Sequence, residues 1–265
     1  MSLERYTEKS YWDNLYTDQE KTPLEVEGFR FKTNADLYRA FQKIDLDNKN
    51  ILEIGAGDSQ WVTFLAKHHP SSSITGLDYS ESGCIELKRR AEQDDVDIDI
   101  ICADMFSPPE ELIGKFDIVY SMGVVEHFDK LSEVVEALSQ FLKPDGILFS
   151  EIPNLSGIYG PIVRWLDLDI YNLHNPHDAP SLVAGHKSAG MDIIDSGYIA
   201  TTEFAVVSSC INESTHWFKR ILMINLMRLS KLISLFEYKL FELPKSKLFS
   251  PLIFCAATKS KNRES

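Results

Sequence analysis

Apolar and polar positions follow two rhythms along the middle of the chain. Short apolar runs predict strands, and between them apolar residues recur at the spacing of amphipathic helices. The predicted strands are 50–54, 73–77, 98–102, 116–120 and 147–151, and the clearest helices between them are 58–69, 81–92 and 131–142. Because consecutive parallel strands need a crossover connection, this order predicts an α/β fold, with a mostly parallel sheet and helices on both faces.

Segments with a different pattern flank this region. Residues 1–48 carry aromatic side chains at helical spacing and form a predicted N-terminal helical cap, followed by a core domain at 49–207. Residues 250–265 are predicted to hold the last strand and the tail. Two further strands, at 196–204 and 250–258, bring the predicted sheet to seven strands.

Residues 208–249 form a predicted helical insertion between the last two strands. They contain seven basic and three acidic residues, in a chain whose formal net charge is -13. Their apolar residues would cover more of the helix surface than the single apolar stripe of a helix that is exposed to solvent. Three interpretations stay open: a lid over an apolar substrate or a homodimer surface, a helix lying on a membrane surface, and ordinary core packing.

The charge and the cysteines restrict the partners. A net charge of -13 disfavours nucleic acid, because phosphate binding needs a basic surface. No apolar run approaches the roughly 18 residues that span a bilayer, and the start of the chain lacks the apolar region of a secretory signal. The four cysteines are scattered, without the spacing of a metal or redox motif. These features predict a cytoplasmic protein that acts on a small molecule.

The stretch NILEIGAGDSQW, at 50–61, places a glycine turn between a strand and a helix. Such a turn leaves backbone N–H groups free to bind the polar groups of a cofactor. The residues of the turn are Gly55, Ala56 and Gly57. The sequence therefore predicts a cofactor crevice at the carboxyl end of the first strand.

Two carboxylates follow the next two strands. Asp78 is placed to accept hydrogen bonds from ribose hydroxyls, with capping of the next helix as the alternative. Asp104 can accept a hydrogen bond from an exocyclic amino group, beside the apolar Met105, with an ordinary aspartate at the start of a loop as the alternative. A dinucleotide site would also need a glycine three residues after Gly57, where this chain has Gln60.

The pattern Glu53-x-Gly55-x-Gly57 resembles the ExGxG signature of class I S-adenosylmethionine-dependent methyltransferases. Further segments match that family in order: LDYS at 77–80, ADMF at 103–106, FDIVYSMGVVEHF at 116–128 and LKPDGILFSEIPN at 142–154. The resemblance covers roughly residues 48–155 and is closest to small-molecule methyltransferases of ubiquinone biosynthesis. It implies a Rossmann-like seven-stranded sheet and S-adenosyl-L-methionine as the cofactor. Glu53 would steady the glycine turn and the amino end of the methionine moiety.

The resemblance also implies further cofactor contacts. Tyr79 would pack beside the adenine, and Ser121 and Met122, at the end of the fourth strand, would contact the methionine portion. Tyr11 and Trp12 match an aromatic position in the amino-terminal helix of these enzymes and would close the cofactor in. Packing within the cap is the alternative for this aromatic pair.

Methyl transfer from a sulfonium is an in-line displacement, so the protein must mainly align the reactants and exclude water. A base is needed only where the acceptor atom carries a proton. His127, His174 and His177 are candidate bases near the predicted mouth of the crevice. A structural role is the alternative for His127. For the segment of His174 and His177 the alternatives are a hydrogen-bonding wall, a solvated loop and a metal cluster. The segment around His127 also resembles the E-x-x-E-H pattern that is linked to a divalent cation in ubiquinone-biosynthesis O-methyltransferases. Gly123 stands at its first glutamate, which removes one carboxylate ligand, so no metal-binding residue is assigned and metal dependence stays open.

The sequence therefore predicts S-adenosylmethionine-dependent methyl transfer to a small-molecule acceptor. O-methylation is preferred, on a hydroxyl or carboxyl of a secondary metabolite, a quinone or a lipid-like substrate. A small-molecule N-methyltransferase and a non-catalytic protein that binds the cofactor are the alternatives. A nicotinamide-dependent oxidoreductase is disfavoured by Gln60.

Overall fold

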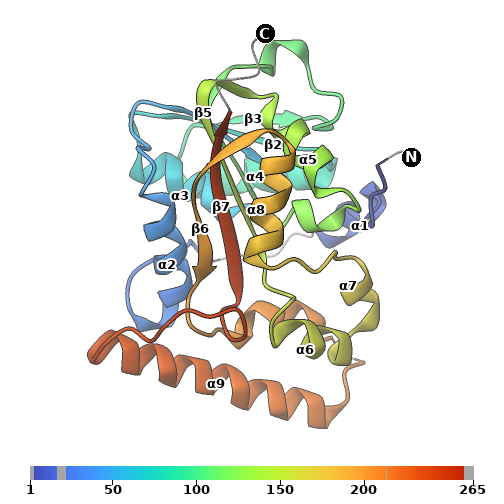
Figure 1. Cartoon of the computed structure of the whole chain (residues 1–265), viewed down its shortest axis with the longest axis vertical. Coiled ribbons are helices and arrows are strands. Elements are labelled where there is room, and N and C mark those ends of the chain that lie inside the picture. Colours follow the sequence, from blue (N-terminus) through green and yellow to red (C-terminus); the bar gives the residue numbers. More distant parts are fainter. Residues whose placement is uncertain (1–2, 17–21, 213, 260–265) are drawn as a thin grey trace.

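The computed structural model describes residues 3–16, 22–212 and 214–259, and its strands form one sheet (Figure 1). The strands are β1 (Asn50–Ile54), β2 (Ser73–Asp78), β3 (Asp99–Cys102), β4 (Phe116–Met122), β5 (Leu142–Pro153), β6 (Met191–Ile199) and β7 (Leu252–Lys259). Their order is β3-β2-β1-β4-β5-β7-β6. The first five strands in this order pair in parallel, and β7 is antiparallel to both its neighbours. The predicted Rossmann-like, seven-stranded and mostly parallel sheet is confirmed.

Helices cover both faces of this sheet, each over its own hydrophobic cluster. One face carries α2 (Lys32–Phe41), α3 (Gln60–His68) and α4 (Glu81–Asp94), and the other carries α5 (Leu131–Ser139) and α8 (Ala179–Ser188). On the first face, the ring of Phe41 lies 5.1 Å from that of Tyr120 and 4.9 Å from that of Phe149, between ring centroids. α3 and α5 thus bury apolar residues of the stripes that their residue spacing predicts.

The described residues form four more helices: α1 (Lys9–Leu15), α6 (Tyr159–Leu166), α7 (Leu168–Asn172) and α9 (Trp217–Lys239). Short 3-10 turns include η3 (Val125–His127) and η4 (Phe204–Cys210). A third hydrophobic cluster, around Tyr159, Phe204 and Met223, joins α6, η4 and α9. Figure 1 shows α9 beyond the arrowhead of β6, at the side of the sheet that is formed by the carboxyl ends of the parallel strands. Since ligands of such sheets bind at this edge, these helices surround the place where a site is expected.

The sixth strand lies earlier in the chain than its hydrophobic pattern predicts. β6 covers 191–199 rather than 196–204, and residue 204 begins η4. Gly190, with φ +79°, ends α8 and turns the chain directly into β6. As an edge strand, β6 exposes the polar side chains of Asp192 and Ser196, which hide its beginning in the sequence pattern.

Other boundaries also differ from the sequence prediction. β5 begins at Leu142, so the helix predicted over 131–142 ends at Ser139. Within the predicted insertion at 208–249, α9 occupies only 217–239. Within the predicted cap, α1 contacts α4 whereas α2 belongs to the layer on the sheet. None of the helices in the described ranges is both long enough and apolar enough to cross a membrane.

Candidate active site

The glycine turn follows β1 and is tied to the end of β2. Gly55 has φ +76° and Gly57 has φ +34°, values that a residue without a Cβ atom adopts at low cost. The turn's N–H groups, expected to be free, are in fact paired within the protein. Those of Gly55 and Ala56 donate to the carbonyl of Leu77, and that of Gly57 donates to Asp78 Oδ2 at 2.8 Å. The turn is therefore held in shape without a ligand.

Glu53 supports the same turn from β1. Its Oε2 accepts hydrogen bonds from the Tyr120 hydroxyl at 2.6 Å and from Ser59 Oγ at 2.8 Å. Ser59 Oγ in turn accepts from the N–H of Trp61 at 3.0 Å and so caps α3. Burial raises the pKa of Glu53 to about 8, although its two hydrogen-bond donors act in the opposite direction. A cationic group bound beside Glu53 would favour its ionised form.

Asp78 is buried at the end of β2, and both its oxygens accept backbone hydrogen bonds. Oδ2 accepts from Gly57, and Oδ1 accepts from the N–H of Ser80 at 2.7 Å. Burial raises the pKa of Asp78 to about 6, and the N–H donors limit that rise. Because each carboxylate oxygen has a second lone pair, Asp78 can still accept from two ribose hydroxyls.

At the other end of the crevice, the carboxylate of Asp104 pairs with Arg5. Arg5 Nη2 lies 2.5 Å from both oxygens of Asp104. The guanidinium carbon lies 5.0 Å from the ring centroids of Tyr79 and Phe106. A flat cationic group between two aromatic rings and bonded to Asp104 occupies the position expected for an adenine and its amino group. In this structure, therefore, Arg5 holds the predicted base site.

Two aromatic residues of the N-terminal segment divide the crevice. Trp12 and Tyr16 stack with centroids 6.1 Å apart, and Trp12 Nε1 donates to Thr7 Oγ1 at 3.1 Å. A cavity of about 120 Å³ lies on the side of Asp104, and a hollow of about 390 Å³ lies on the side of Glu53. Both are lined by Trp12, Tyr16, Gly55 and Met122. The two together form one crevice. Only the cavity beside Asp104 is smaller than the roughly 300–1,000 Å³ of a typical ligand pocket, and Arg5 and Tyr16 are among the side chains that line it.

Most of the predicted cofactor residues surround this crevice. The predicted residues that line the first cavity are Trp12, Gly55, Asp78, Tyr79, Asp104, Met105, Met122 and His127, and those of the second also include Glu53 and Ala56. Gly57 lies directly against the Tyr16 ring. Tyr11 lines neither cavity and packs edge-on against Trp12, with centroids 5.2 Å apart. Ser121 is fully buried in β4, and its hydroxyl has no hydrogen-bond partner within the described ranges.

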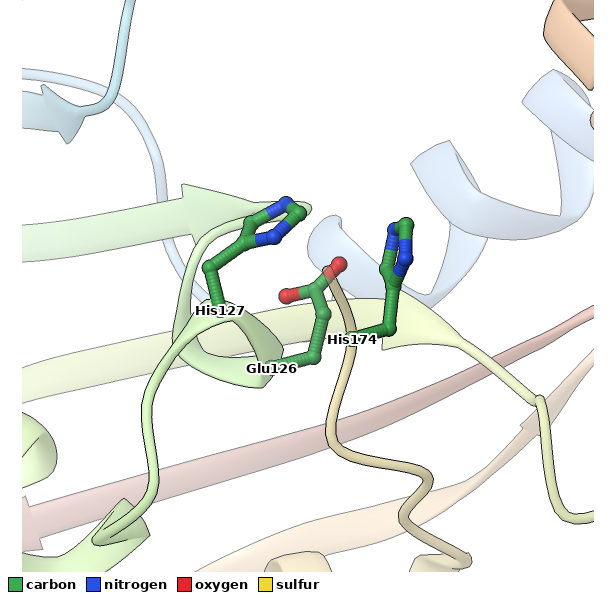
Figure 2. Close-up of side chains that lie close together, drawn as sticks. All are labelled: Glu126, His127 and His174. Carbon is green, nitrogen blue, oxygen red and sulfur yellow. The ribbon is translucent and has the colours of Figure 1, made fainter. Parts of the chain in front are cut away.

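Two of the three predicted histidines meet beside the crevice (Figure 2). His127, on η3, and His174, after α7, have ring centroids 4.6 Å apart. His127 Nδ1 lies 2.7 Å from the carbonyl of Leu173, and His174 Nδ1 lies 2.7 Å from the carbonyl of Ile170. Since a carbonyl oxygen can only accept, both Nδ1 atoms carry the proton and both Nε2 atoms keep a lone pair.

A buried glutamate completes this cluster. The donor atoms of Glu126, His127 and His174 all lie within 4.8 Å of one another, a set that can hold a metal ion. Burial lowers the pKa of His127 to about 4, with the neighbouring His174 adding to the effect, so its imidazole is neutral at pH 7. Burial raises the pKa of Glu126 to about 8, and the charge of Glu151 adds to that rise. The cluster can therefore accept a proton or bind a cation.

His177 lies apart from the cluster. Its Nδ1 is 3.2 Å from Ser181 Oγ, in the capping box that begins α8. The capping residue is Asp178, which also pairs with Lys247 at 2.6 Å. His177 thus takes part in the start of a helix, and only the first residue of the His-Asn-Pro-His-Asp segment joins the cluster.

Sequence reasoning did not select several residues of the site. Arg5, Thr7, Tyr16 and Phe128 line the first cavity, and Glu126 belongs to the cluster. Tyr16 had a usable signal, because it follows Trp12 by four residues and so shares its helical face. Arg5 had none, since its partners are far away in the chain.

The fold and the crevice define the class of protein. Residues 52–148 match the family described as a methyltransferase domain. The sheet order, with its antiparallel β7, and the position of the crevice agree with this match. The chain therefore contains a class I S-adenosylmethionine-dependent methyltransferase domain.

Particular relatives differ in the atom that they methylate. Over 112 residues, the chain is 33% identical to the ubiquinone biosynthesis O-methyltransferase of Coxiella burnetii, covering 41% of this chain and 45% of the relative. Over 143 residues, it is 27% identical to the (S)-coclaurine N-methyltransferase of Papaver somniferum, covering 51% and 37%. The chain thus aligns with less than half the length of these curated relatives.

A solved structure gives the same fold over nearly the whole chain. The geranyl diphosphate C-methyltransferase of Streptomyces coelicolor A3(2), in complex with Mg²⁺, geranyl-S-thiolodiphosphate and S-adenosyl-L-homocysteine, has a TM-score of 0.59. It is 12% identical, and the match covers 95% of this chain and 98% of that one. At this identity, the likeness establishes the fold alone.

Proposed function

We propose that this protein transfers the methyl group of S-adenosyl-L-methionine to an oxygen atom of a small, largely apolar acceptor. The observation that carries the proposal is the crevice at the carboxyl ends of β1, β2 and β4. Asp78 and Asp104 line it on one side, and the buried, neutral His127 forms part of its wall. Such a crevice combines hydrogen-bond acceptors for a nucleoside with a nitrogen that can take part in proton removal.

The polar groups of the crevice fit the cofactor. Asp78 would accept hydrogen bonds from the ribose hydroxyls, and Asp104 would accept one from the adenine amino group. Glu53 would balance the positive charge of the methionine amino group. Arg5 now holds Asp104, so its guanidinium has to leave when the adenine binds. When bound, the cofactor supplies the activated methyl group.

The protein's own residues then align the acceptor, exclude water and handle a proton. Trp12 and Tyr16 cover the glycine turn and keep water from the crevice. The acceptor oxygen forms a bond to the methyl carbon as the carbon–sulfur bond breaks, and S-adenosylhomocysteine leaves with the electron pair on sulfur. The proton of the acceptor hydroxyl must leave. The cluster offers the Nε2 lone pairs of His127 and His174 to accept it, and His127 lines the crevice.

A screen with a labelled methyl donor tests this function. Phenols, carboxylic acids and amines are supplied as acceptors, and label in the product is counted. We expect label in hydroxyl or carboxyl acceptors, and we expect His127→Ala to lower that rate while S-adenosylhomocysteine still binds. Label in amines alone would favour the N-methyltransferase alternative, and cofactor binding without any product would favour the non-catalytic one. The net charge of -13 makes nucleic acid an unsuitable acceptor.

The outer face of α9 supports a second part of the proposal, which concerns where the acceptor is met. α9 buries Met223, Ser230, Ser234 and Glu237 against the protein. Eight of its large apolar side chains are exposed: Trp217, Phe218, Ile221, Leu222, Ile224, Leu229, Leu232 and Phe236. A helix that buries serine and exposes leucine has a surface suited to a partner.

We infer that this partner is an anionic membrane surface. Within α9 the charged residues are five basic ones and the buried Glu237, namely Lys219, Arg220, Arg228, Lys231, Lys239 and Glu237. Two copies of the chain joined through this face would bring like charges together, which disfavours a homodimer. Lipid head groups of negative charge complement it, and the exposed apolar side chains can enter the boundary of the acyl chains. An acceptor dissolved in the membrane would then lie close to the edge of the sheet that holds the crevice.

A further inference from the structure

Three side chains that bind metals converge beside the crevice (Figure 2). We propose that Glu126, His127 and His174 bind one divalent transition-metal ion, and that this ion binds the acceptor oxygen. Their donor atoms lie within 4.8 Å of one another. The role of the ion toward the acceptor rests on the proposed methyl transfer, whereas the metal site itself does not.

The two imidazoles are held in the protonation state that a metal needs. Each Nδ1–H donates to a backbone carbonyl, His127 to Leu173 and His174 to Ile170. Nε2 is thereby left as the nitrogen that can bind an ion. A metal-bound histidine almost always has its other nitrogen fixed by such a hydrogen bond.

The loop that carries His174 is fastened to η3. The N–H of Asn175 donates to the carbonyl of Glu126 at 2.6 Å, and its side-chain amide donates to the carbonyl of Phe128 at 3.4 Å. With the bond from His127 to Leu173, three hydrogen bonds join the two segments. The ligands are therefore brought together by the fold before any ion binds.

The carboxyl group of Glu126 lacks a partner that its position requires. Glu126 is 1% exposed, and its Oε2 has no hydrogen-bond partner among the residues that the structure describes. A buried polar atom without a partner is costly, and a cation would supply the missing interaction. Glu151, also buried, leaves its Oε1 similarly without a partner and adds a second carboxyl group that favours a positive charge nearby.

The set of donors selects the kind of ion. Mg²⁺ and Ca²⁺ take oxygen ligands, whereas two imidazoles with one carboxylate suit Zn²⁺, Fe²⁺ or Co²⁺. Three protein ligands leave at least one coordination position for water or an acceptor oxygen. The site is therefore of the kind found at catalytic rather than structural metals.

The position of the site gives the ion a task in methyl transfer. His127 lines the cavity and lies edge-on to Trp12, with centroids 5.2 Å apart. An acceptor hydroxyl bound to the ion would have a lower pKa and lose its proton to water. The resulting oxygen would form the bond to the methyl carbon while the carbon–sulfur bond breaks. The ion would then replace a histidine base, because both imidazoles would be used as ligands.

Titration of the chelator-treated full chain with Co²⁺ tests the site directly. Co²⁺ bound by nitrogen and oxygen ligands gives visible absorption, and Zn²⁺ added afterwards should displace it. We expect one ion per chain, and we expect Mg²⁺ at the same concentration to leave the absorption unchanged. His174→Gln and Glu126→Gln should each weaken Co²⁺ binding by about 100-fold or more, beyond the effect of losing an outer-shell partner.

His177→Gln is the matched control, because it changes a nearby histidine outside the cluster and should keep the affinity for Co²⁺. Thermal melting and binding of S-adenosylhomocysteine establish that each variant is folded. A wild-type protein that binds S-adenosylhomocysteine but no Co²⁺, or a His174→Gln variant that binds Co²⁺ like the wild type, would overturn the metal site. Failure to bind S-adenosylhomocysteine with Co²⁺ binding intact would instead count against the proposed function.

Discussion

At the scale of single residues, the site depends on carboxylates kept away from water. Glu53, Asp78 and Glu126 are all buried, and burial raises the pKa of each. Hydrogen bonds offset the burial of two of them: Glu53 accepts from two hydroxyl groups, and Asp78 accepts from two backbone N–H groups. Oε2 of Glu126 has no such partner among the described residues. This difference separates a support of the turn, a ribose acceptor and a proposed metal ligand.

The pKa of Asp78 predicts how cofactor binding depends on pH. Ribose hydroxyls donate to the ionised carboxylate, so affinity should be full above pH 6 and fall as pH decreases through about 6. At one pH unit below this pKa, S-adenosylhomocysteine should bind about tenfold more weakly. Calorimetry from pH 7.5 to 5 measures this loss. Asp78→Asn should bind weakly throughout and lack the decrease, and a wild-type affinity that stays flat to pH 5 would contradict the role of Asp78.

The pair of Arg5 and Asp104 predicts a competition with the adenine. Arg5→Ala removes the guanidinium from the base site and should strengthen binding of S-adenosylhomocysteine. Both side chains are partly exposed, at 29% and 40%, so the pair is worth at most about 1 kcal/mol and the gain should not exceed about fivefold. Lys9→Ala is the control, because Lys9 lies on the same N-terminal segment as Arg5 but pairs with Glu81 of α4 instead of Asp104. Weaker binding by Arg5→Ala would mean that Arg5 stacks on the adenine instead of competing with it.

At the scale of elements, α9 differs from an ordinary solvated helix because it exposes many apolar side chains and buries several polar ones. Ile224 and Leu232 lie on its exposed side, in one stripe with Trp217, Ile221, Arg228 and Lys239. Such a stripe, apolar with interspersed positive charge, is typical of helices that lie in the plane of a membrane interface. The inner face is held by polar contacts instead: Ser230 bonds to Glu203 and to the N–H of Phe204, and Glu237 accepts hydrogen bonds from Thr201 and Leu243.

The membrane proposal predicts sedimentation of the protein with vesicles of mixed phosphatidylserine and phosphatidylcholine, and much less with pure phosphatidylcholine. The double variant Ile224→Glu and Leu232→Glu should lose this binding and keep its affinity for S-adenosylhomocysteine. Ile194→Glu changes an equally exposed residue on β6 and should still bind. Absence of wild-type sedimentation would exclude the membrane, and a dimer in solution that the double variant abolishes would assign the face to a second copy.

Local chemistry explains which elements could be predicted from the sequence. The strand, glycine turn and capped helix at 50–61 use residues next to one another, so hydrophobic spacing and glycine suffice to predict them. Asp78 and Asp104 follow from the rule that parallel strands end at one edge. The pairing of Arg5 with Asp104 and the approach of His174 to Glu126 depend on tertiary folding between distant segments. For that reason the sequence pattern, with Gly123 in place of a glutamate, did not indicate a set of metal ligands. The fold brings His174 to Glu126 and His127 from a distant segment.

At the scale of the whole molecule, the crevice and α9 share the edge where the parallel strands end (Figure 1). Figure 1 shows α6, α7 and α9 together at the lower end of the fold. The remaining surface carries the excess of negative charge, because the chain is at -13 while α9 is basic. Such a distribution would orient the protein, with the crevice toward an anionic surface and the acidic remainder away from it.

The measurement that tests the central claim most directly is calorimetry of the purified chain with S-adenosylhomocysteine and, separately, with NAD. We predict saturable binding of one S-adenosylhomocysteine per chain at pH 7.5, lost in Asp78→Ala, and no measurable binding of NAD. Tight binding of NAD, or no binding of S-adenosylhomocysteine by a protein that melts cooperatively, would contradict the assignment of this crevice to a methyl donor.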